Sequence, residues 1–440
     1  MRALQRRPWV PTESENYIQS IAAAVAASEP QSLELEIGRL TRENRAIHEV
    51  RCINLNPATN VMNPKAEAFL ASGLGTRASL GYPGDKYEMG LEAVERIEII
   101  ATELAAEIFS ARYAEIRVPS GGMANLYAFM ATCKPGDRII VPPTNVGGHV
   151  THHQSGAAGL YGLMVHVAPS DAEGYSIDID GLRALAKLIR PRLITIGGSL
   201  NLFPHPVRAI RAIADEFGAW LLFDAAHLSG LVAGRVWPHP LAEGAHLMTM
   251  STYKSLGGPP SGLVVTDDAT LAERLEKIAY PGLTANFDVS RSAALAMTLL
   301  DWRVHGPAYA QAMCQLAKSL ASGLERAGVP VFATTRGHTA SHQFALDAVQ
   351  FGGGQSAART LRRANVLTSG IGLPGPEVPG DFNGLRIGTP EIARWGMSIE
   401  AMDELAELVS LALLGKEPPE RVALRITDLR RRFSTLRYIR

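Results

Sequence analysis

Seven short apolar runs constrain the fold of this chain more than any other feature of its sequence. Several are almost continuously apolar, which is typical of strands buried on both faces of a sheet. Helical stretches such as Val207–Phe217 lie between them. This alternation predicts an α/β fold built on a mostly parallel, seven-stranded sheet. The expected strands are Glu115–Pro119, Arg138–Pro142, Leu163–Ala168, Arg192–Ile196, Ala219–Asp224, His246–Met250 and Ser261–Thr266.

The rest of the chain divides around this sheet. We expect an N-terminal helical arm and connecting segment over 1–65 and a large domain over 66–298. A smaller α+β domain follows over 299–416, introduced by a long helix from Leu299 to Arg326, and a basic helical tail covers 417–440. The arginines of the tail are expected on a solvated helix face rather than in a binding surface. A chain of 440 residues is long enough for these two domains and an ample core.

Composition excludes several classes of function. The 43 Lys and Arg residues balance the 43 Asp and Glu residues, so no electrostatic argument favours binding to nucleic acid or to a membrane surface. Cys52, Cys133 and Cys314 are too few and too scattered for a disulfide framework or a metal site. We expect a cytoplasmic protein, because no apolar run reaches membrane-spanning length and the arginine-bearing N-terminus lacks the features of a secretory signal.

An Asp near the end of a predicted strand and a Lys about thirty residues later indicate a cofactor site. The apolar run Leu222–His227 contains Asp224 near a predicted strand end, and Lys254 follows in the Ser- and Thr-flanked segment Ser251–Ser255. Pyridoxal 5′-phosphate (PLP) needs an anion beside its pyridine nitrogen and an amine for its aldehyde, and these two residues supply both. A buried Asp paired with a structural Lys would give the same pattern. A third element therefore matters.

That element is a turn of small residues between a predicted strand and an alanine-rich helix. Ser120, Gly121 and Gly122 would let backbone N–H groups close on a phosphate at the helix N-terminus, where the helix dipole favours anions. Such a turn alone is a weak signal. Upstream of Asp224 and Lys254, it predicts the phosphate site of PLP.

Four ordered motifs carry a family resemblance. The sequence resembles serine hydroxymethyltransferase, a fold-type I PLP enzyme similar in fold to aspartate aminotransferase, from about Ile53 to Met397. The matching segments are Gly81–Tyr87 with its Gly-Tyr-Pro-Gly, Gly147–His152 with its Gly-Gly-His, Asp224–Val232 and Leu385–Pro390.

The resemblance implies a role for each matched residue. Lys254 would form the Schiff base with PLP, and Asp224 would hold the pyridinium proton. His149 would stack on the ring, and His227 would approach the phenolic oxygen of PLP. Arg386 would grip the substrate carboxylate through the two-point fork of its guanidinium group. The other binding residues implied are Ser120, Gly121, Gly122 and Ser251 for the cofactor and Tyr82 for the substrate.

Departures from the family pattern cluster at the folate site. The family's Glu before Gly-Tyr-Pro-Gly, which serves proton transfer and contacts folate, is replaced by Leu80. An apolar side chain there leaves polar groups of the pterin unmatched, at a cost of about 1–3 kcal/mol each. We therefore expect no use of tetrahydrofolate. The other departures are Ala78 and Glu88 at two Tyr positions, Tyr253 for His, Ser369–Ile371 for Asn-Lys-Asn, and Thr284–Asn286 for a cross-subunit Gln-Gly-Gly.

The leading hypothesis is a folate-independent aldolase that cleaves or forms the Cα–Cβ bond of a β-hydroxy-α-amino acid. Glu88, His152 and Tyr253 are the candidate general bases. Small Ala78 and apolar Leu80 would enlarge and dry the pocket, which fits α-methylserine cleaved to alanine and formaldehyde. A β-hydroxy amino acid with a larger apolar side chain fits nearly as well.

Three alternatives stay open at this point. The chain could be a hydroxymethyltransferase acting on serine or α-methylserine with a rebuilt folate site. It could catalyse another PLP reaction, such as transamination, racemisation or transaldol exchange, or it could be a non-catalytic binding protein. The resemblance further implies a homodimer or a dimer of dimers, with Tyr82 and the Tyr280–Gly282 loop at the interface.

Overall fold

The computed structural model describes residues 4–171 and 173–440, so the first three residues of the predicted arm lie outside the described part. The chain separates into two compact units, the first ending at Cys52 and the second beginning at Ile53. The first unit consists of helices α1 (Thr12–Ala27) and α2 (Pro30–Arg45), followed by one π-helical segment, η1 (Ala46–Arg51). The predicted N-terminal arm and connecting segment over 1–65 stays a prediction as a part of the domain division.

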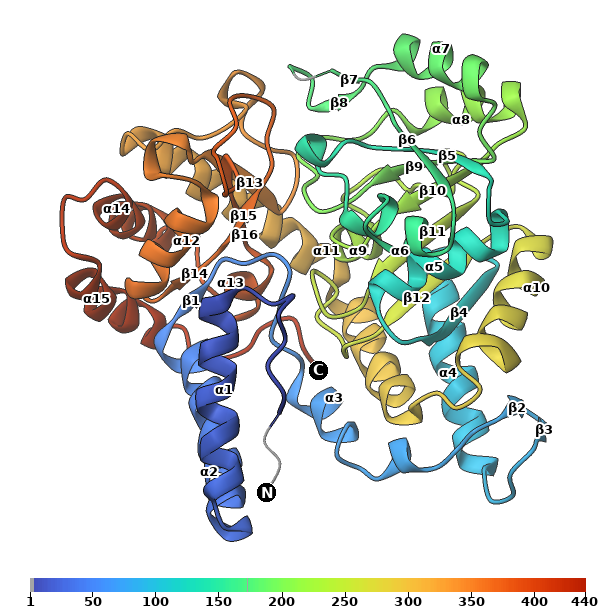
Figure 1. The fold of residues 1–440 in the computed structure, drawn as a ribbon, viewed down its shortest axis with the longest axis horizontal. Coiled ribbons are helices and arrows are strands. Elements are labelled where there is room, and N and C mark those ends of the chain that lie inside the picture. The colour runs from blue at the N-terminus through green and yellow to red at the C-terminus, as the bar shows by residue number, and fades with distance from the viewer. Residues whose placement is uncertain (1–3, 172) are drawn as a thin grey trace. The chain divides into compact units, whose positions relative to one another are not determined.

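The second unit is built on a seven-stranded sheet whose strand order is β4-β12-β11-β10-β9-β5-β6 (Figure 1). Strand β12 pairs antiparallel with β11 and β4, and the other strand pairs of this sheet are parallel, so the predicted mostly parallel α/β sheet is confirmed. All seven predicted runs form its strands. The observed bounds are β4 (Tyr113–Val118), β5 (Arg138–Val141), β6 (Met164–Val167), β9 (Leu193–Gly197), β10 (Trp220–Asp224), β11 (Leu247–Ser251) and β12 (Gly262–Thr266).

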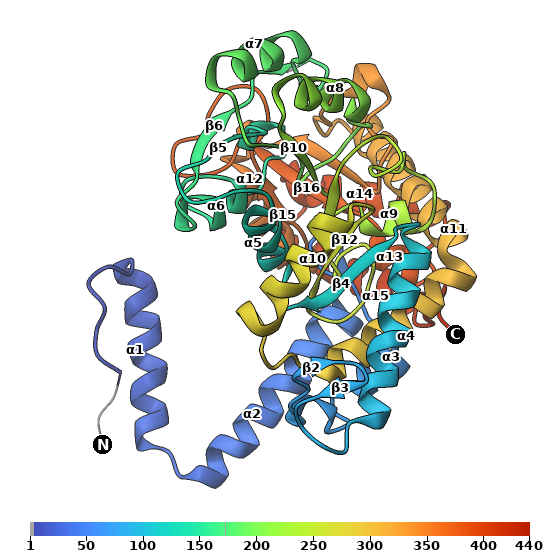
Figure 2. The same cartoon turned by 90° about the vertical axis from the view of Figure 1, so that its right-hand side faces the viewer.

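Helices pack on this sheet. Figure 2 shows α4 (Glu92–Ile108) and α10 (Ala269–Lys277) beside β4 and β12. Helix α5 (Gly121–Thr132) packs against β11 and β12, and α8 (Val207–Phe217) packs against β10 and against α7 (Ile179–Ile189). The side chains of the central strands are therefore buried, which explains their continuous apolar runs.

A smaller three-stranded sheet has the order β13-β16-β15 and packs against α12 (Gly354–Arg363). Its strands are β13 (Gln343–Asp347), β15 (Ser369–Ile371) and β16 (Gly384–Gly388). The long helix α11 (Val289–Arg326) links the two sheets and begins ten positions earlier than expected, because the Asp288 side chain caps its first turn. Since the predicted boundary at residue 299 falls inside this helix, the division into domains stays a prediction.

The basic tail differs from its sequence interpretation. Helix α15 (Pro419–Arg431) ends at Arg431, and Arg430 is buried with its guanidinium 4.0 Å from the centre of the Trp395 ring. Arg425, Arg431 and Arg432 are exposed, as expected. Arg430 thus contributes to packing, because its aliphatic chain and planar guanidinium group can cover the Trp395 ring.

The remaining α-helices and β-strands are short, except for α14. They are β1 (Ile53–Asn54), α3 (Pro64–Phe69), β2 (Gly81–Tyr82), β3 (Asp85–Lys86), α6 (Ala157–Leu160), β7 (Ser170–Asp171), β8 (Ser176–Ile177), α9 (Ser229–Ala233), β14 (Val366–Leu367), α13 (Pro390–Arg394) and α14 (Ala401–Leu413). No helix in the described ranges combines the length and apolarity needed to cross a bilayer.

Candidate active site

The carboxyl ends of three neighbouring strands bring the candidate residues together. Asp224 ends β10, where it pairs in register with Gly197 of β9 and Thr249 of β11. Ligands of open α/β sheets bind at this edge, because the loops that leave the strands can converge there. The site is therefore built on the rigid centre of the sheet.

Asp224 is a buried carboxylate with several hydrogen-bond donors around it. Its Oδ2 accepts hydrogen bonds from His152 Nε2 at 2.9 Å and from Asn125 Nδ2 at 3.0 Å, while Oδ1 accepts one from the backbone N–H of Ala226 at 2.9 Å. Burial alone would raise the pKa of Asp224, but these hydrogen bonds and the neighbouring histidines lower it below its ordinary value. Asp224 is therefore an anion at neutral pH.

Lys254 lies in the turn after β11 and is also buried. Its Nζ is 3.2 Å from His227 Nε2. Burial lowers the pKa of Lys254 to about 8. The carboxylate of Asp224 raises this pKa and partly offsets the loss of solvent, whereas the positive charge of Arg386 lowers it further. A measurable fraction of this amine is uncharged near neutral pH, which is the form that attacks an aldehyde.

Arg386 on β16 faces the same group of residues. Its Nη1 donates to the Ser199 carbonyl oxygen at 2.7 Å, and its Nη2 donates to Ser369 Oγ at 3.0 Å. The Nε–H is buried and has no protein acceptor. Burial lowers the pKa of Arg386 to about 10, so the guanidinium still carries its charge at neutral pH. A buried cation with an unused donor can bind a carboxylate.

A cradle of small residues lies at the N-terminus of α5. Ser120 caps the helix by accepting a hydrogen bond from the Met123 N–H at 3.2 Å. A Cβ atom added at Gly121 would lie 2.0 Å from Ser251 Oγ and 3.1 Å from Ser251 Cβ, so the absence of a side chain favours this close approach of α5 to the end of β11. The backbone N–H groups that begin the helix are thus held next to Ser251.

An open cleft of about 520 Å³ leads to the site. Its lining includes His149, Ser199 and Arg386, together with Gly375 and Glu377 from the loop between β15 and β16. His149 Nδ1 lies 2.8 Å from Thr151 Oγ1, and burial lowers the pKa of His149 to about 4, so its ring is neutral. A small polar ligand can therefore reach Arg386.

Two predicted residues lie apart from this group. Glu88 accepts a hydrogen bond from the Leu80 N–H at 3.1 Å, and Tyr82 lines a separate pocket with Ile99 of α4. Neither has a described contact with Lys254. Tyr253 lies nearer, with its ring centre 6.0 Å from Lys254 Nζ.

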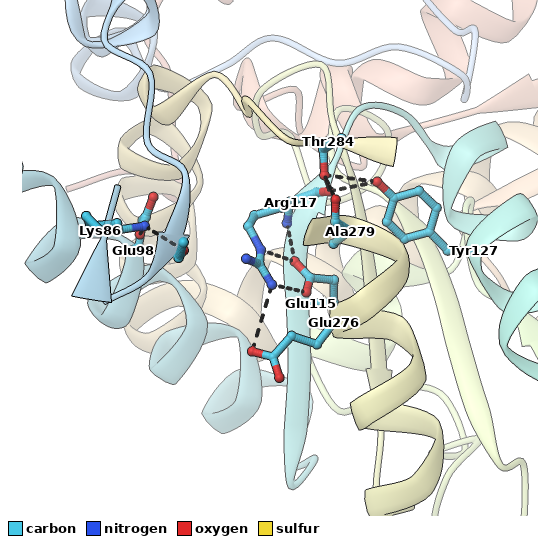
Figure 3. Close-up of polar contacts among 9 residues, drawn as sticks. Lys86, Glu98, Glu115, Arg117, Tyr127, Glu276, Ala279 and Thr284 are labelled. Carbon is cyan, nitrogen blue, oxygen red and sulfur yellow. Dashed lines mark hydrogen bonds and ion pairs between the residues drawn. The ribbon is translucent and has the colours of Figure 1, made fainter. Parts of the chain in front are cut away.

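Figure 3 shows how the segment that carries Glu88 and Tyr82 is fixed. Lys86 Nζ of β3 lies 2.6 Å from Glu98 Oε2 of α4, and both side chains are largely buried. On neighbouring β4, Arg117 contacts Glu115 at 2.8 Å and Glu276 at 3.9 Å. The β2–β3 hairpin is thus tied to α4 in a defined position.

Thr284, which stands at a departure from the family pattern, makes hydrogen bonds within this chain. Its Oγ1 lies 3.0 Å from the Ala279 carbonyl oxygen, 3.1 Å from that of Arg117 and 3.2 Å from Tyr127 Oη (Figure 3). These contacts fasten the loop that contains Tyr280 to β4.

Three residues that support the site were not predicted from the sequence. Asn125 bridges Asp224 and Thr249, Gln343 contacts His227, and Asn60 Nδ2 donates to the Lys254 carbonyl oxygen at 3.0 Å. Their partners lie far away in sequence, so no local pattern marks Gln343 or Asn60. Only Asn125 carried a signal, because it follows the glycine turn on the inner face of α5.

Comparison with known proteins decides the family. The sequence model described as serine hydroxymethyltransferase matches residues 32–409. The chain belongs to the serine hydroxymethyltransferase family. The fold-type I architecture expected from the resemblance is thereby confirmed, since this family has that fold and the observed sheet matches it.

Two of the similar proteins are named α-methylserine aldolase, and a more distant one is named serine hydroxymethyltransferase. An α-methylserine aldolase from Ralstonia sp is 57% identical over 437 residues, covering 99% of this chain and 100% of that protein. An α-methylserine aldolase from Variovorax paradoxus is 60% identical, with 99% of each chain covered. A serine hydroxymethyltransferase from Staphylothermus marinus is 34% identical, with 92% of each chain covered.

Proposed function

We propose that this chain is a PLP-dependent aldolase that cleaves α-methylserine to alanine and formaldehyde without tetrahydrofolate. Full-length identity of 57% and 60% to proteins named α-methylserine aldolase supports the substrate. The observation that carries the reaction class is the buried Lys254 amine, 3.2 Å from His227 and facing the charges of Asp224 and Arg386.

The residues present fit PLP. Asp224 Oδ1 uses one of its lone pairs on the Ala226 N–H and keeps another for a pyridinium N–H. The close approach of Gly121 to Ser251 leaves backbone donors at the start of α5 for a phosphate. PLP, when bound, would supply an aldehyde that condenses with amines and a cationic ring that accepts the electron pair released at the substrate Cα.

Each residue then has a defined task. Arg386 holds the substrate carboxylate through its Nε–H, which the protein leaves without an acceptor. Asp224 keeps its negative charge, because His152 and Asn125 donate to it. His149 presents a neutral, flat ring at the cleft, as stacking on the cofactor requires. Lys254 provides the amine that exchanges with the substrate amine.

The general base must take a proton from the β-hydroxyl group of the substrate. His152 is poorly placed for this, because Thr195 at 3.0 Å and Asp224 at 2.9 Å engage both ring nitrogens. We infer that His152 instead orients Asp224. Glu88 is the better candidate, since its carboxylate lies at the Leu80 backbone, the position at which the family carries its own Glu. Tyr253, close to Lys254, is the second candidate.

A homodimer, or a dimer of dimers, would bring Glu88 to the site of a second subunit. Large apolar side chains on and beside the β2–β3 hairpin support an interface there, because they are exposed in the single chain. They are Tyr82, Tyr87, Met89, Ile99 and Ile100. Tyr82 would then contact the partner's substrate. We propose a cytoplasmic location, consistent with three free cysteines.

A substrate panel scored for aldehyde release tests the function. Purified, PLP-loaded enzyme should release formaldehyde from α-methylserine at the same rate with and without tetrahydrofolate. Alanine should accumulate in equal amount. α-Methylserine has no hydrogen on Cα, so neither racemisation nor transamination can begin by removal of a Cα proton. Failure to release aldehyde from α-methylserine, serine or a larger β-hydroxy amino acid would refute the aldolase.

One other function is favoured by a specific observation. Relatives named serine hydroxymethyltransferase are 34–36% identical over most of their length, which supports transfer of a hydroxymethyl group to tetrahydrofolate. In that case turnover would depend on tetrahydrofolate. Leu80 argues against it, because it replaces the family Glu that contacts folate.

A further inference from the structure

Lys254 begins a tight turn that ends at Gly257. The Gly257 N–H donates to the Lys254 carbonyl oxygen at 2.9 Å, and Gly257 has a left-handed φ of 68°. The same carbonyl oxygen accepts a second hydrogen bond from Asn60 Nδ2 at 3.0 Å, and Arg394 Nη1 donates to the Gly257 carbonyl oxygen at 3.3 Å. A Cβ atom added at Gly257 would lie 2.8 Å from Arg394 Nη1 and 3.0 Å from Asn60 Nδ2. The turn therefore packs closely against both side chains.

Tyr309 on α11 fixes the orientation of the Asn60 carboxamide. The Tyr309 hydroxyl group must donate to the Pro390 carbonyl oxygen at 2.7 Å, because a carbonyl oxygen can only accept. The Tyr309 oxygen can then only accept from Asn60 at 2.9 Å, so Asn60 must present its NH₂ group there. The Lys254 carbonyl oxygen requires the same group. The NH₂ group of Asn60 thus joins the Lys254 turn to Tyr309.

The Tyr309 ring is buried among three flat groups. The ring of Tyr438, near the C-terminal end of the chain, stacks on it with the ring centres 5.1 Å apart and the planes at 19°. The Trp302 ring centre lies 5.2 Å away, and the guanidinium of Arg394 lies 4.9 Å from the centre of the Tyr309 ring. Burial raises the pKa of Tyr309, so its hydroxyl group keeps the proton that it donates. Close packing therefore holds the hydroxyl oxygen in one place.

We propose that Asn60 is a positioning residue that, oriented by Tyr309, fixes the backbone of Lys254. The lysine amine stands at the end of a flexible four-carbon chain, so its place 3.2 Å from His227 Nε2 depends on where the backbone starts that chain. Asn60 Oδ1 is buried and has no donor among the described residues, so the fold places this carboxamide for its NH₂ group. The inference rests on the proposed function, in which the Lys254 amine binds PLP.

Two substitutions interrupt this connection. Asn60→Leu keeps a side chain of similar size but removes both N–H bonds, while the Lys254 carbonyl oxygen retains the Gly257 N–H. Tyr309→Phe keeps the stacked ring and removes the hydroxyl group. Each should lower kcat of the PLP-loaded enzyme about 3- to 10-fold and change KM by less than about twofold. The double variant should be no slower than Asn60→Leu alone, because Tyr309 acts through Asn60. The control is Tyr161→Phe, whose hydroxyl group also donates to a backbone carbonyl and whose loss should leave kcat unchanged.

The titration of Lys254 in the apoprotein is a second readout. Trace labelling with acetic anhydride acylates only uncharged amines, and mass spectrometry gives the rate at Lys254 relative to an added standard amine at each pH. In the unmodified apoprotein the midpoint should lie near the pKa of about 8. Asn60→Leu should raise this midpoint, because a loosened turn lets water reach the amine. The charged and titratable groups that face the amine stay unchanged in this variant; they are His227, Asp224 and Arg386.

Two results would overturn the proposal. One is an unchanged labelling midpoint of Lys254 in Asn60→Leu, or in Tyr309→Phe if the first variant does not fold. The other is a lower melting temperature with unchanged kcat in both single variants, which would show a purely structural role. Absence of aldehyde release from the unmodified enzyme would refute the proposed aldolase instead, and the labelling of the apoprotein would still decide whether Asn60 positions Lys254.

Discussion

Lys254 is the residue on which the chemistry depends, because the fold holds its amine away from water. The structure keeps the pKa of this amine near 8, whereas the unfolded chain would restore a pKa of about 10.4. Burial of Lys254 thus destabilises the apoprotein at every pH at which this lysine would be charged in the unfolded chain. The gain is an amine that loses its proton near neutral pH.

The stability of the apoprotein should therefore depend on pH through Lys254. Unfolding takes up a proton between the two pKa values, so the contribution of Lys254 to the free energy of unfolding should rise with pH above about 8 and be flat below it. From pH 7 to pH 9.5 the unmodified apoprotein should gain about 2 kcal/mol relative to Lys254→Met in urea unfolding. The control is Lys187→Met at an exposed position, which should show no such dependence on pH. If the difference in the free energy of unfolding between the unmodified protein and Lys254→Met did not change with pH, the buried amine would be contradicted.

Arg386 should govern affinity for the amino acid. Arg386→Lys removes the Nε–H and the flat fork while keeping the charge, and one charge-assisted hydrogen bond is worth about 1.5–3 kcal/mol. We expect KM to rise about 10- to 100-fold with little change in PLP affinity. Arg183→Lys, at a half-exposed surface ion pair, is the matched control and should leave KM unchanged. An unchanged KM in Arg386→Lys would remove Arg386 from the substrate site.

The site residues that the sequence predicts are those in local motifs. Asp224, His227 and Lys254 stand at strand ends beside turn residues, and the structure brings all three together. Gln343 could not be found this way, because it lies 116 positions from His227 and its own surroundings read as an ordinary apolar strand. Contacts of this kind depend on how the two sheets pack.

Elements follow from the sequence where a periodic pattern decides them. The seven strands of the large sheet were predictable because burial on both faces makes each run apolar. The ends of helices were harder to predict. Helix α11 starts at Val289 because the Asp288 side chain caps it, and an apolar pattern does not reveal such a cap. The burial of Arg430 against Trp395 likewise depends on tertiary packing.

The junction of α5 with β11 should tolerate no side chain at Gly121. Gly121→Ala would place a Cβ 2.0 Å from Ser251 Oγ and 3.1 Å from Ser251 Cβ. The Ser251 side chain must then rotate and the two elements must move slightly apart, which should cost about 1–3 kcal/mol in the free energy of unfolding. PLP affinity should fall with it. Adding Ser251→Gly should restore much of the stability. Gly122→Ala is the control for stability, since its nearest neighbour would be 3.5 Å away. Equal stability of the two alanine variants would contradict this packing.

The largest apolar cluster among the described residues contains Phe223 of the large sheet, Leu299 of α11 and Phe344 of the small sheet. The active-site cleft lies where loops of the two sheets meet. The exposed apolar side chains around the β2–β3 hairpin lie outside this core. They are the reason to expect a second subunit.

A double substitution in this apolar surface should separate the subunits. Met89→Glu with Ile100→Glu places charges at two exposed apolar positions, so light scattering should change from a dimer or tetramer to a monomer. Aldehyde release should fall with it, because Glu88 would no longer reach a second site. Leu188→Glu on α7, which is 79% exposed, should leave both unchanged. A monomeric unmodified protein with full activity would contradict the shared site.

The most direct test of the account is chemical trapping of PLP on the protein. Loaded enzyme is reduced with borohydride and digested, and the pyridoxyl-modified peptide is identified by mass spectrometry. We predict a single modified peptide with the label on Lys254, and no label in Lys254→Met. Modification of another lysine, or an unlabelled protein after loading, would contradict the claim that this buried amine is the centre of the active site.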